Sequence, residues 1–191
     1  CSKSCENNIV RIFTVLKRCL AYKTNPLWIG SGTGQHDAYF APRLRHLEWH
    51  TSDMTDKNFG IAAWLEEVTV NNLYQPLSFT IGATSAWPLT NTDAVYTANT
   101  THIMQPLESK FMMQLVADNL LVGGIFCQYG PYNFQGQYSS ESNKSFDQHL
   151  SEQGCGGIRD IDELALWAKP LVIIETIPMP ANNFILVWQK Q

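Results

Sequence analysis

The sequence has few charged residues, no basic cluster and no long apolar run. Asp, Glu, Lys and Arg make up 16% of the 191 residues, and 17 acidic against 13 basic side chains give a net charge of −4. Proteins that bind the nucleic acid backbone usually carry a basic excess gathered in a patch, so nucleic acid is not expected as a partner. The longest apolar run, residues 120–127, contains two glycines and is far too short to span a membrane.

Cysteine and histidine form no recognisable cluster either. The five cysteines are odd in number and include no C-x-x-C pair, which favours reduced thiols over a disulfide framework. His46 and His50 lie four residues apart with no third ligand at a suitable spacing, so no metal is expected. The first residues, CSKSCENN, are too polar for a secretory signal. Together these features predict a cytoplasmic protein.

The length and the 45% hydrophobic content predict a single globular domain over residues 1–191. Apolar residues at helical spacing predict an N-terminal helix within residues 1–25, ended by Asn25-Pro26. Residues 133–157, rich in Ser, Gln, Asn and Gly, are expected to form a loop-rich insertion. The remaining expected elements are strands at 27–29, 47–53, 77–81, 94–97, 125–129, 171–177 and 183–188, and helices at 59–70, from 106 and from 161.

Strands that alternate with helices predict an α/β protein, a mostly parallel sheet with helices on both faces. The turn at 178–182 is short enough for an antiparallel hairpin, so the last strand is expected to be antiparallel. Ligands of such sheets bind at the carboxyl ends of the strands, near the point where strand order reverses. This rule directs attention to the residues after the first, second and fourth strands.

A glycine-rich turn follows the first predicted strand. It comprises Gly30, Ser31, Gly32, Thr33 and Gly34, and its glycines permit a tight bend and close approach of a ligand to the backbone. Asp53 ends the second strand, where a carboxylate can accept hydrogen bonds from both hydroxyls of a ribose. The pattern predicts a cofactor that contains a nucleoside.

The spacing of the glycines distinguishes between two cofactors. A dinucleotide site usually has G-x-G-x-x-G, and the last glycine of that pattern is replaced here by Gln35. The G-x-G-x-G form is typical of enzymes that use S-adenosyl-L-methionine (SAM). A nicotinamide-dependent oxidoreductase is therefore a disfavoured alternative.

Several further motifs, spread over nearly the whole chain, make the sequence similar to a known family. They are Cys5-Glu6-Asn7-Asn8, 30–36, Ser52-Asp53, Asn99 with His102, 129–132, Ser142-Asn143 with Phe146-Asp147, 157–160 and 179–183. The chain resembles the class I SAM-dependent methyltransferases, and more narrowly the family that includes methyltransferase-like protein twenty-six. The resemblance implies a Rossmann-like sheet of seven strands with the last antiparallel. It also implies SAM at residues 30–34 with its ribose on Asp53, and S-adenosyl-L-homocysteine as product.

Two positions depart from the pattern of these methyltransferases. An acidic residue usually precedes the first glycine by two and helps to hold the amino group of the cofactor, but this chain has Trp28. A second acidic residue is usual after the third strand, beside the adenine, where this chain has Thr80. Both changes remove polar contacts, so the alternative to an enzyme is a degenerate module with the same fold and no turnover.

Methyl transfer from a sulfonium needs alignment of acceptor, methyl and sulfur more than it needs a catalytic group. Asn99 follows the fourth strand and is a candidate hydrogen-bonding partner of the cofactor or acceptor. His102 is a candidate base, and Tyr129 a candidate for the acceptor pocket, although each is also compatible with a structural role. The function expected is SAM-dependent methylation of a small-molecule acceptor.

Overall fold

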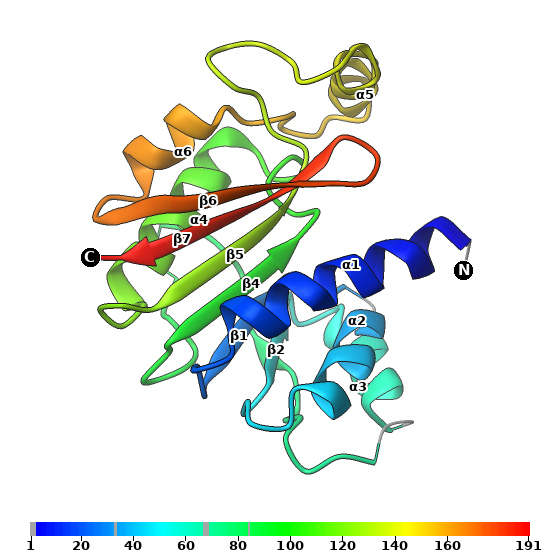
Figure 1. The fold of residues 1–191 in the computed structure, drawn as a ribbon, viewed down its shortest axis with the longest axis vertical. Helices are drawn as coiled ribbons and strands as arrows, with labels where there is room; N and C mark the ends of the chain where they lie inside the picture. The colour runs from blue at the N-terminus through cyan, green and yellow to red at the C-terminus, as the bar shows by residue number, and fades with distance from the viewer. Residues whose placement is uncertain (1–2, 33, 67–68, 84) are drawn as a thin grey trace.

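A computed structural model describes residues 3–32, 34–66, 69–83 and 85–191, with the backbone alone for 3–7, 59–60 and 64–65. One sheet of seven strands runs through the molecule, with helices packed against it (Figure 1). The strands are β1 Pro26–Ile29, β2 His50–Asp53, β3 Leu77–Ser78, β4 Ala94–Ala98, β5 Ile125–Gly130, β6 Leu171–Met179 and β7 Asn183–Lys190. The helices are α1 Lys3–Cys19, α2 Gln35–Phe40, α3 Asn58–Glu66, α4 Pro106–Asn119, α5 Glu141–Glu152 and α6 Ile161–Trp167, with a 3-10 turn at Ala41–Arg43.

The strand order is β3-β2-β1-β4-β5-β7-β6, which confirms the predicted sheet. The neighbouring pairs from β3 to β5 are parallel, and β7 lies antiparallel between β5 and β6. Chain order reverses between β1 and β4, because β1 is followed by β2 on one side and flanked by β4 on the other. The carboxyl ends of β1 and β4 therefore form the switch point where ligands of such sheets bind.

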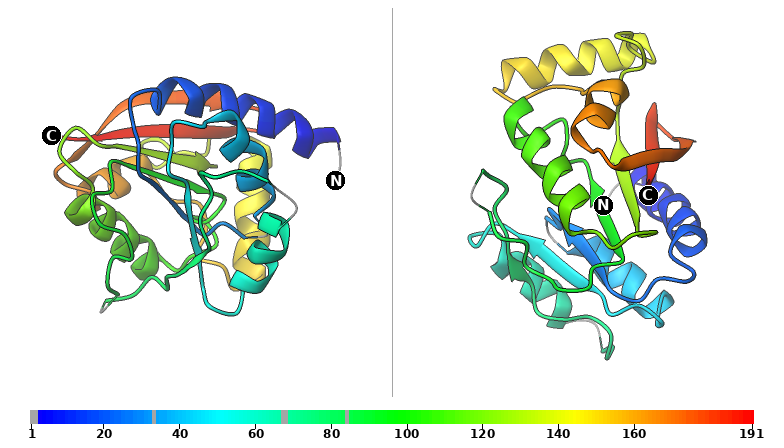
Figure 2. Two further views of the ribbon diagram at one scale, coloured as in Figure 1. Left: turned by 90° about the horizontal axis from the view of Figure 1, so that it is seen from below. Right: turned by 90° about the vertical axis from the view of Figure 1, so that its left-hand side faces the viewer.

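The two faces of the sheet carry separate hydrophobic cores. Side chains of a strand alternate between faces, so Trp28 of β1 faces α1 and α2, while its neighbours Leu27 and Ile29 face the other side. Figure 2 shows α1 on one face of the sheet and α4 and α6 on the other. Met112 and Leu164 fill the core beneath α4 and α6, and α3 contacts α2.

The expectation of a loop-rich insertion at 133–157 is wrong, because the segment contains α5. The Ser140 hydroxyl caps this helix by accepting a hydrogen bond from Asn143 N at 3.0 Å. Only Asn143 and Leu150 of its residues are buried, so the helix lacks the apolar stripe by which helices are recognised. Smaller differences concern boundaries: β2 begins at His50 rather than at residue 47, and β3 ends at Ser78 rather than at residue 81.

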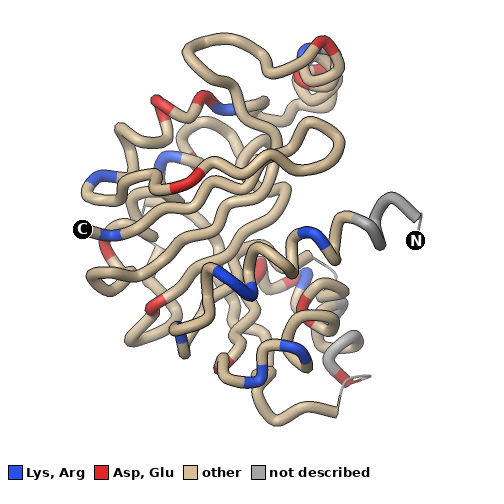
Figure 3. Tube along the Cα trace, viewed as in Figure 1, with Lys and Arg blue, Asp and Glu red and all other residues tan. Residues whose placement is uncertain are grey.

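Charged residues are scattered along the chain (Figure 3). Arg18 of α1 and Glu175 of β6 form an exposed ion pair, with Nη2 and Oε2 2.6 Å apart. Among the helices within the described ranges, none is long and apolar enough to cross a membrane.

Candidate functional site

A pocket of about 430 Å³ opens at the carboxyl ends of β1, β2 and β4. Its walls come from the glycine turn after β1, the end of β2, the segment after β3, and the loop between β4 and α4. It is lined by Ile29, Gly30, Gly32, Asp53, Met54, Lys57, Phe79, Thr80, Ile81, Ala98, Asn99, Thr100, Ile103, Met104 and Glu108. The lining is mainly apolar with a few polar groups, as is usual for small-molecule sites.

The glycine turn is held against β2 by its backbone. The N–H groups of Gly30 and Ser31 both donate to the Ser52 carbonyl, at 2.9 and 3.0 Å. Gly30, Gly32 and Gly34 all have positive φ, of 70°, 61° and 79°, which residues with a side chain adopt only with strain. The repeated glycines are therefore required by the path of the backbone.

Asp53 is buried and fixes both the turn and the end of β2. Its Oδ2 accepts a hydrogen bond from Gly32 N at 2.8 Å, and its Oδ1 accepts one from Met54 N at 2.8 Å. The residue is 7% exposed. An ionised carboxylate has about four acceptor positions, so capacity for two further donors remains.

The other predicted cofactor-binding residues behave differently from one another. The Ser31 hydroxyl is buried and accepts a hydrogen bond from Ser52 N at 3.3 Å, so its role is to hold the glycine turn against β2. Asn99 is exposed, lines the pocket, and has a positive φ of 55°. Strained backbone of this kind in a residue other than glycine is common at functional sites. Thr33 lies outside the described residues.

The two predicted catalytic residues do not line the pocket. His102 is 4% exposed, and its ring packs edge-on against Phe146 of α5 with centroids 5.6 Å apart. Burial lowers the pKa of His102 to about 4, against a smaller opposing effect of the Asp147 carboxylate. Tyr129 is 3% exposed and belongs to the core beneath α1. The structure thus brings together Gly30, Gly32, Asp53 and Asn99, but not these two side chains.

Of the two departures from the methyltransferase pattern, only one faces the pocket. Thr80 lines it, and the Thr80 carbonyl accepts a short hydrogen bond from the Ser85 hydroxyl. Trp28 is 3% exposed and packs among Phe40, Trp49 and Tyr96 in the core beneath α1 and α2. The Trp28 indole ring therefore lies outside the pocket.

Several lining residues have no motif that the sequence analysis could detect. Met54 and Lys57 follow β2, Phe79 and Ile81 follow β3, and Glu108 belongs to the first turn of α4. Their position directly after strands was the one available signal, since the carboxyl ends of parallel strands share one edge of a sheet.

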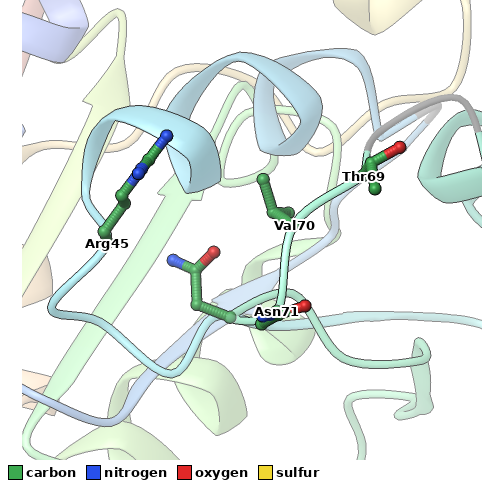
Figure 4. A pocket seen from close by; sticks show the side chains of 5 residues that line it. Arg45, Thr69, Val70 and Asn71 are labelled. Carbon is green, nitrogen blue, oxygen red and sulfur yellow. The ribbon is translucent and has the colours of Figure 1, made fainter.

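A second cavity, of about 240 Å³, lies beside the amino end of β2 (Figure 4). Arg45, Thr69, Val70, Asn71 and Asn72 line it. The Asn72 side chain is occupied in donating to the carbonyls of Ala41, Leu44 and Leu47, at 2.9–3.2 Å. Within the described ranges, no three His, Cys, Asp or Glu side chains are grouped as metal ligands. The pocket at the carboxyl ends is thus the candidate functional site.

Several solved structures with a similar fold are methyltransferases by their names. An O-methyltransferase family protein from Burkholderia thailandensis has a TM-score of 0.79 at 11% identity, covering 95% of this chain and 56% of that one. An O-methyltransferase family 2 protein from Planctomyces limnophilus DSM 3776, in complex with apigenin, has a TM-score of 0.75 at 15% identity, covering 87% and 51%. Human N-acetylserotonin methyltransferase, in complex with SAM, has a TM-score of 0.72 at 10% identity, covering 94% and 52%.

These similarities establish that the chain has the Rossmann-like class I methyltransferase fold. The chain spans just over half the length of the solved structures that it matches. It belongs to the family described as "Protein of unknown function (DUF938)", which matches residues 1–190.

Proposed function

We propose that this protein binds SAM in the pocket at the carboxyl ends of β1, β2 and β4, and that it transfers the methyl group to a small-molecule acceptor. The observation that carries the proposal is the placement of a buried carboxylate, Asp53, beside a glycine turn at the topological switch point. We also propose that residues 1–191 act as one catalytic domain, that nucleic acid is not a partner of the protein, and that the protein acts in the cytoplasm.

The residues present fit the nucleoside half of SAM. Asp53 retains acceptor capacity for the ribose hydroxyls after binding Gly32 N and Met54 N. Phe79, Ile81 and Met104 supply apolar walls suited to an adenine ring. Gly30 and Gly32 present backbone without side chains, which permits close approach of the sugar.

The bound cofactor supplies an activated methyl group on sulfur, and the role of the chain is to hold acceptor and methyl group in line. Burial and a pKa of about 4 make His102 a weak base at neutral pH. The proposal therefore favours acceptors that are nucleophilic without prior deprotonation. His102 and Tyr129 are proposed to position the ends of β4 and β5 on the acceptor side rather than to take the proton.

The comparisons support this proposal at the level of fold. Three similar structures are methyltransferases, one with SAM and one with apigenin. The narrower resemblance to the family of methyltransferase-like protein twenty-six agrees with the same chemistry, and we propose that the chain is related to it.

Calorimetric titration with S-adenosyl-L-homocysteine tests the proposal. We expect saturable binding that falls at least about tenfold in Asp53→Ala, because charge-assisted hydrogen bonds to the ribose are lost. Asp56→Ala is the matched control, since Asp56 is an exposed acid in the turn that follows β2. Thermal unfolding of both variants checks that they are folded. Absence of binding at millimolar ligand, or equal binding by Asp53→Ala, would contradict the proposal.

A second candidate function is a methyltransferase-like module that binds a nucleoside without turnover. Trp28 and Thr80, in positions where related enzymes carry acids, favour it. Incubation with methyl-labelled SAM and a panel of phenols, thiols and amines distinguishes the two: label transfer supports the enzyme, and binding without transfer to any acceptor supports the module. NAD and NADP in the same thermal-shift series test the dinucleotide alternative, because a ligand of the native state raises the melting temperature.

A further inference from the structure

The last turn of α1 lies over a row of three neighbouring strand residues. Cys127 of β5 is paired with Val187 of β7, and Val187 is paired in turn with Glu175 of β6. Residues directly opposite each other on adjacent antiparallel strands project from the same face of a sheet. The Arg18 guanidinium reaches the far end of this row, where it donates hydrogen bonds of 2.8 and 2.6 Å to the two oxygens of Glu175. The ion pair therefore holds the end of α1 over this part of the sheet.

The other end of the row is covered by Cys19, the last residue of α1. Cys19 packs against the buried core to which Cys127 and Val187 belong. The thiols of Cys19 and Cys127 are hydrogen-bonding partners. Two thiols that lie more than 100 residues apart in the sequence, one from α1 and one from β5, are therefore in contact.

The two thiols differ in exposure and in ionisation. Cys127 is fully buried, whereas Cys19 is partly exposed. The hydrogen bond from the Cys127 thiol lowers the pKa of Cys19 and the positive charge of Arg18 lowers it further, against an opposing effect of burial. The same hydrogen bond, together with burial, raises the pKa of Cys127. Because the thiolate is the form that reacts with oxidants, Cys19 is the thiol that an oxidant attacks first.

We propose that Cys19 and Cys127 are a redox-active pair, in which a hydroperoxide oxidises Cys19 and Cys127 then closes a disulfide between α1 and β5. In the first step the Cys19 sulfur attacks a peroxide oxygen, an S–O bond forms and the O–O bond breaks. The departing hydroxide takes up the Cys19 proton and becomes water. In the second step the Cys127 sulfur attacks the sulfenic sulfur of Cys19, the S–S bond forms, and the hydroxyl leaves as water with the Cys127 proton. Two thiols are thus oxidised while one peroxide is reduced to water.

The inference goes beyond the proposed function and does not rest on it, because neither cysteine lines the pocket. Treatment of the reduced full chain with hydrogen peroxide tests it, followed by alkylation and tryptic digestion without reductant. Trypsin leaves each of the five cysteines in a peptide of its own, at residues 1–3, 4–11, 19–23, 111–144 and 145–159. We expect the main product to be peptide 19–23 joined to peptide 111–144, with both released by dithiothreitol. A disulfide from Cys19 to another cysteine, or irreversible oxidation of Cys19 while Cys127 stays free, would overturn the inference.

Variants test the two roles separately. Cys155→Ser is the matched control, since Cys155 is also partly exposed but follows α5, and we expect it to form the same linked peptide. Cys127→Ala removes the resolving thiol, so Cys19 should remain as a sulfenic acid that dimedone labels. Absence of that label in the folded variant would overturn the order of the two steps. If the variant fails to fold, the linked peptide in the unmodified protein still decides the inference.

The melting temperature reports whether the bond forms without damage to the fold. The disulfide would close a loop of more than 100 residues. We expect peroxide to raise the melting temperature of the unmodified protein by about 5 °C or more, because the cross-link restricts the unfolded chain. Cys19→Ser should show no such rise. A lower melting temperature of the oxidised protein would overturn the proposal that the native contact carries the bond.

Discussion

Replacing Gly30 by alanine tests the geometry of the switch point, and the structure gives the size of the effect. The positive φ of 70° imposes a strain of about 1–2 kcal/mol on any residue with a Cβ. The new methyl group would lie 2.5 Å from Thr100 Cγ2, and overpacking of this kind costs about 1–3 kcal/mol more. We therefore expect Gly30→Ala to lower the free energy of unfolding by about 2–5 kcal/mol.

Two alanine variants separate strain from overlap. Gly32 has a φ of 61° and Gly136 a φ of 73°, and a Cβ on either would meet nothing within 4 Å. We expect each to cost about 1–2 kcal/mol, or about 2–8 °C in melting temperature for a protein of this size. Gly136→Ala is expected to leave nucleoside binding unchanged, since Gly136 does not line the pocket. Urea unfolding measures all three, and equal losses for Gly30→Ala and Gly136→Ala would refute the contact with Thr100.

Three further predictions concern buried polar groups. Burial lowers the pKa of His102 from 6.5 to about 4, so the protein loses stability as the pH falls through that range. His102→Asn should remove up to about 3 kcal/mol of this loss, measured by denaturant titrations at pH 7 and pH 4. A pH dependence equal to that of the parent protein would contradict this prediction. Burial raises the pKa of Asp37, so the protein loses stability as the pH rises above the ordinary pKa of an Asp carboxyl group. The amide oxygen of Asp37→Asn can still accept the hydrogen bond from Trp49, so this variant should unfold at a higher urea concentration than the parent protein at pH 8. A lower urea midpoint would count against this reasoning. The Gln128 side chain accepts a hydrogen bond from Trp188 Nε1 at 3.0 Å and donates one to the Thr101 hydroxyl. Gln128→Leu removes both hydrogen bonds and should lower the free energy of unfolding by about 2–4 kcal/mol, measured by urea unfolding. A decrease below about 1 kcal/mol would refute this prediction.

The features that could be predicted from the sequence are those written in local patterns. Short apolar runs that alternate with helical segments predicted the parallel sheet, and the short turn at 178–182 predicted its antiparallel end. Three glycines followed by Asp53 at the end of the next strand marked the switch point. In both cases neighbouring residues carry the signal, because strand periodicity and the φ of a tight turn are local properties.

Features that depend on distant contacts were not predictable. α5 has a polar sequence and is fixed by its Ser140 cap and by Asn143, which donates to the Asn182 carbonyl at 3.1 Å. Because α5 was missed, the burial of His102 against Phe146 was missed with it. The position of the Trp28 indole follows from alternation along β1, but its edge-to-face contact with Tyr96 requires the register of β1 on β4.

The most direct test of the central claim is the crystal structure of the protein grown with S-adenosyl-L-homocysteine. The account predicts density for the nucleoside in the pocket at the carboxyl ends, with its ribose hydroxyls on the Asp53 carboxylate and its base between Phe79 and Met104. Density in the cavity beside Arg45 and Asn71, or a ribose that does not touch Asp53, would contradict it.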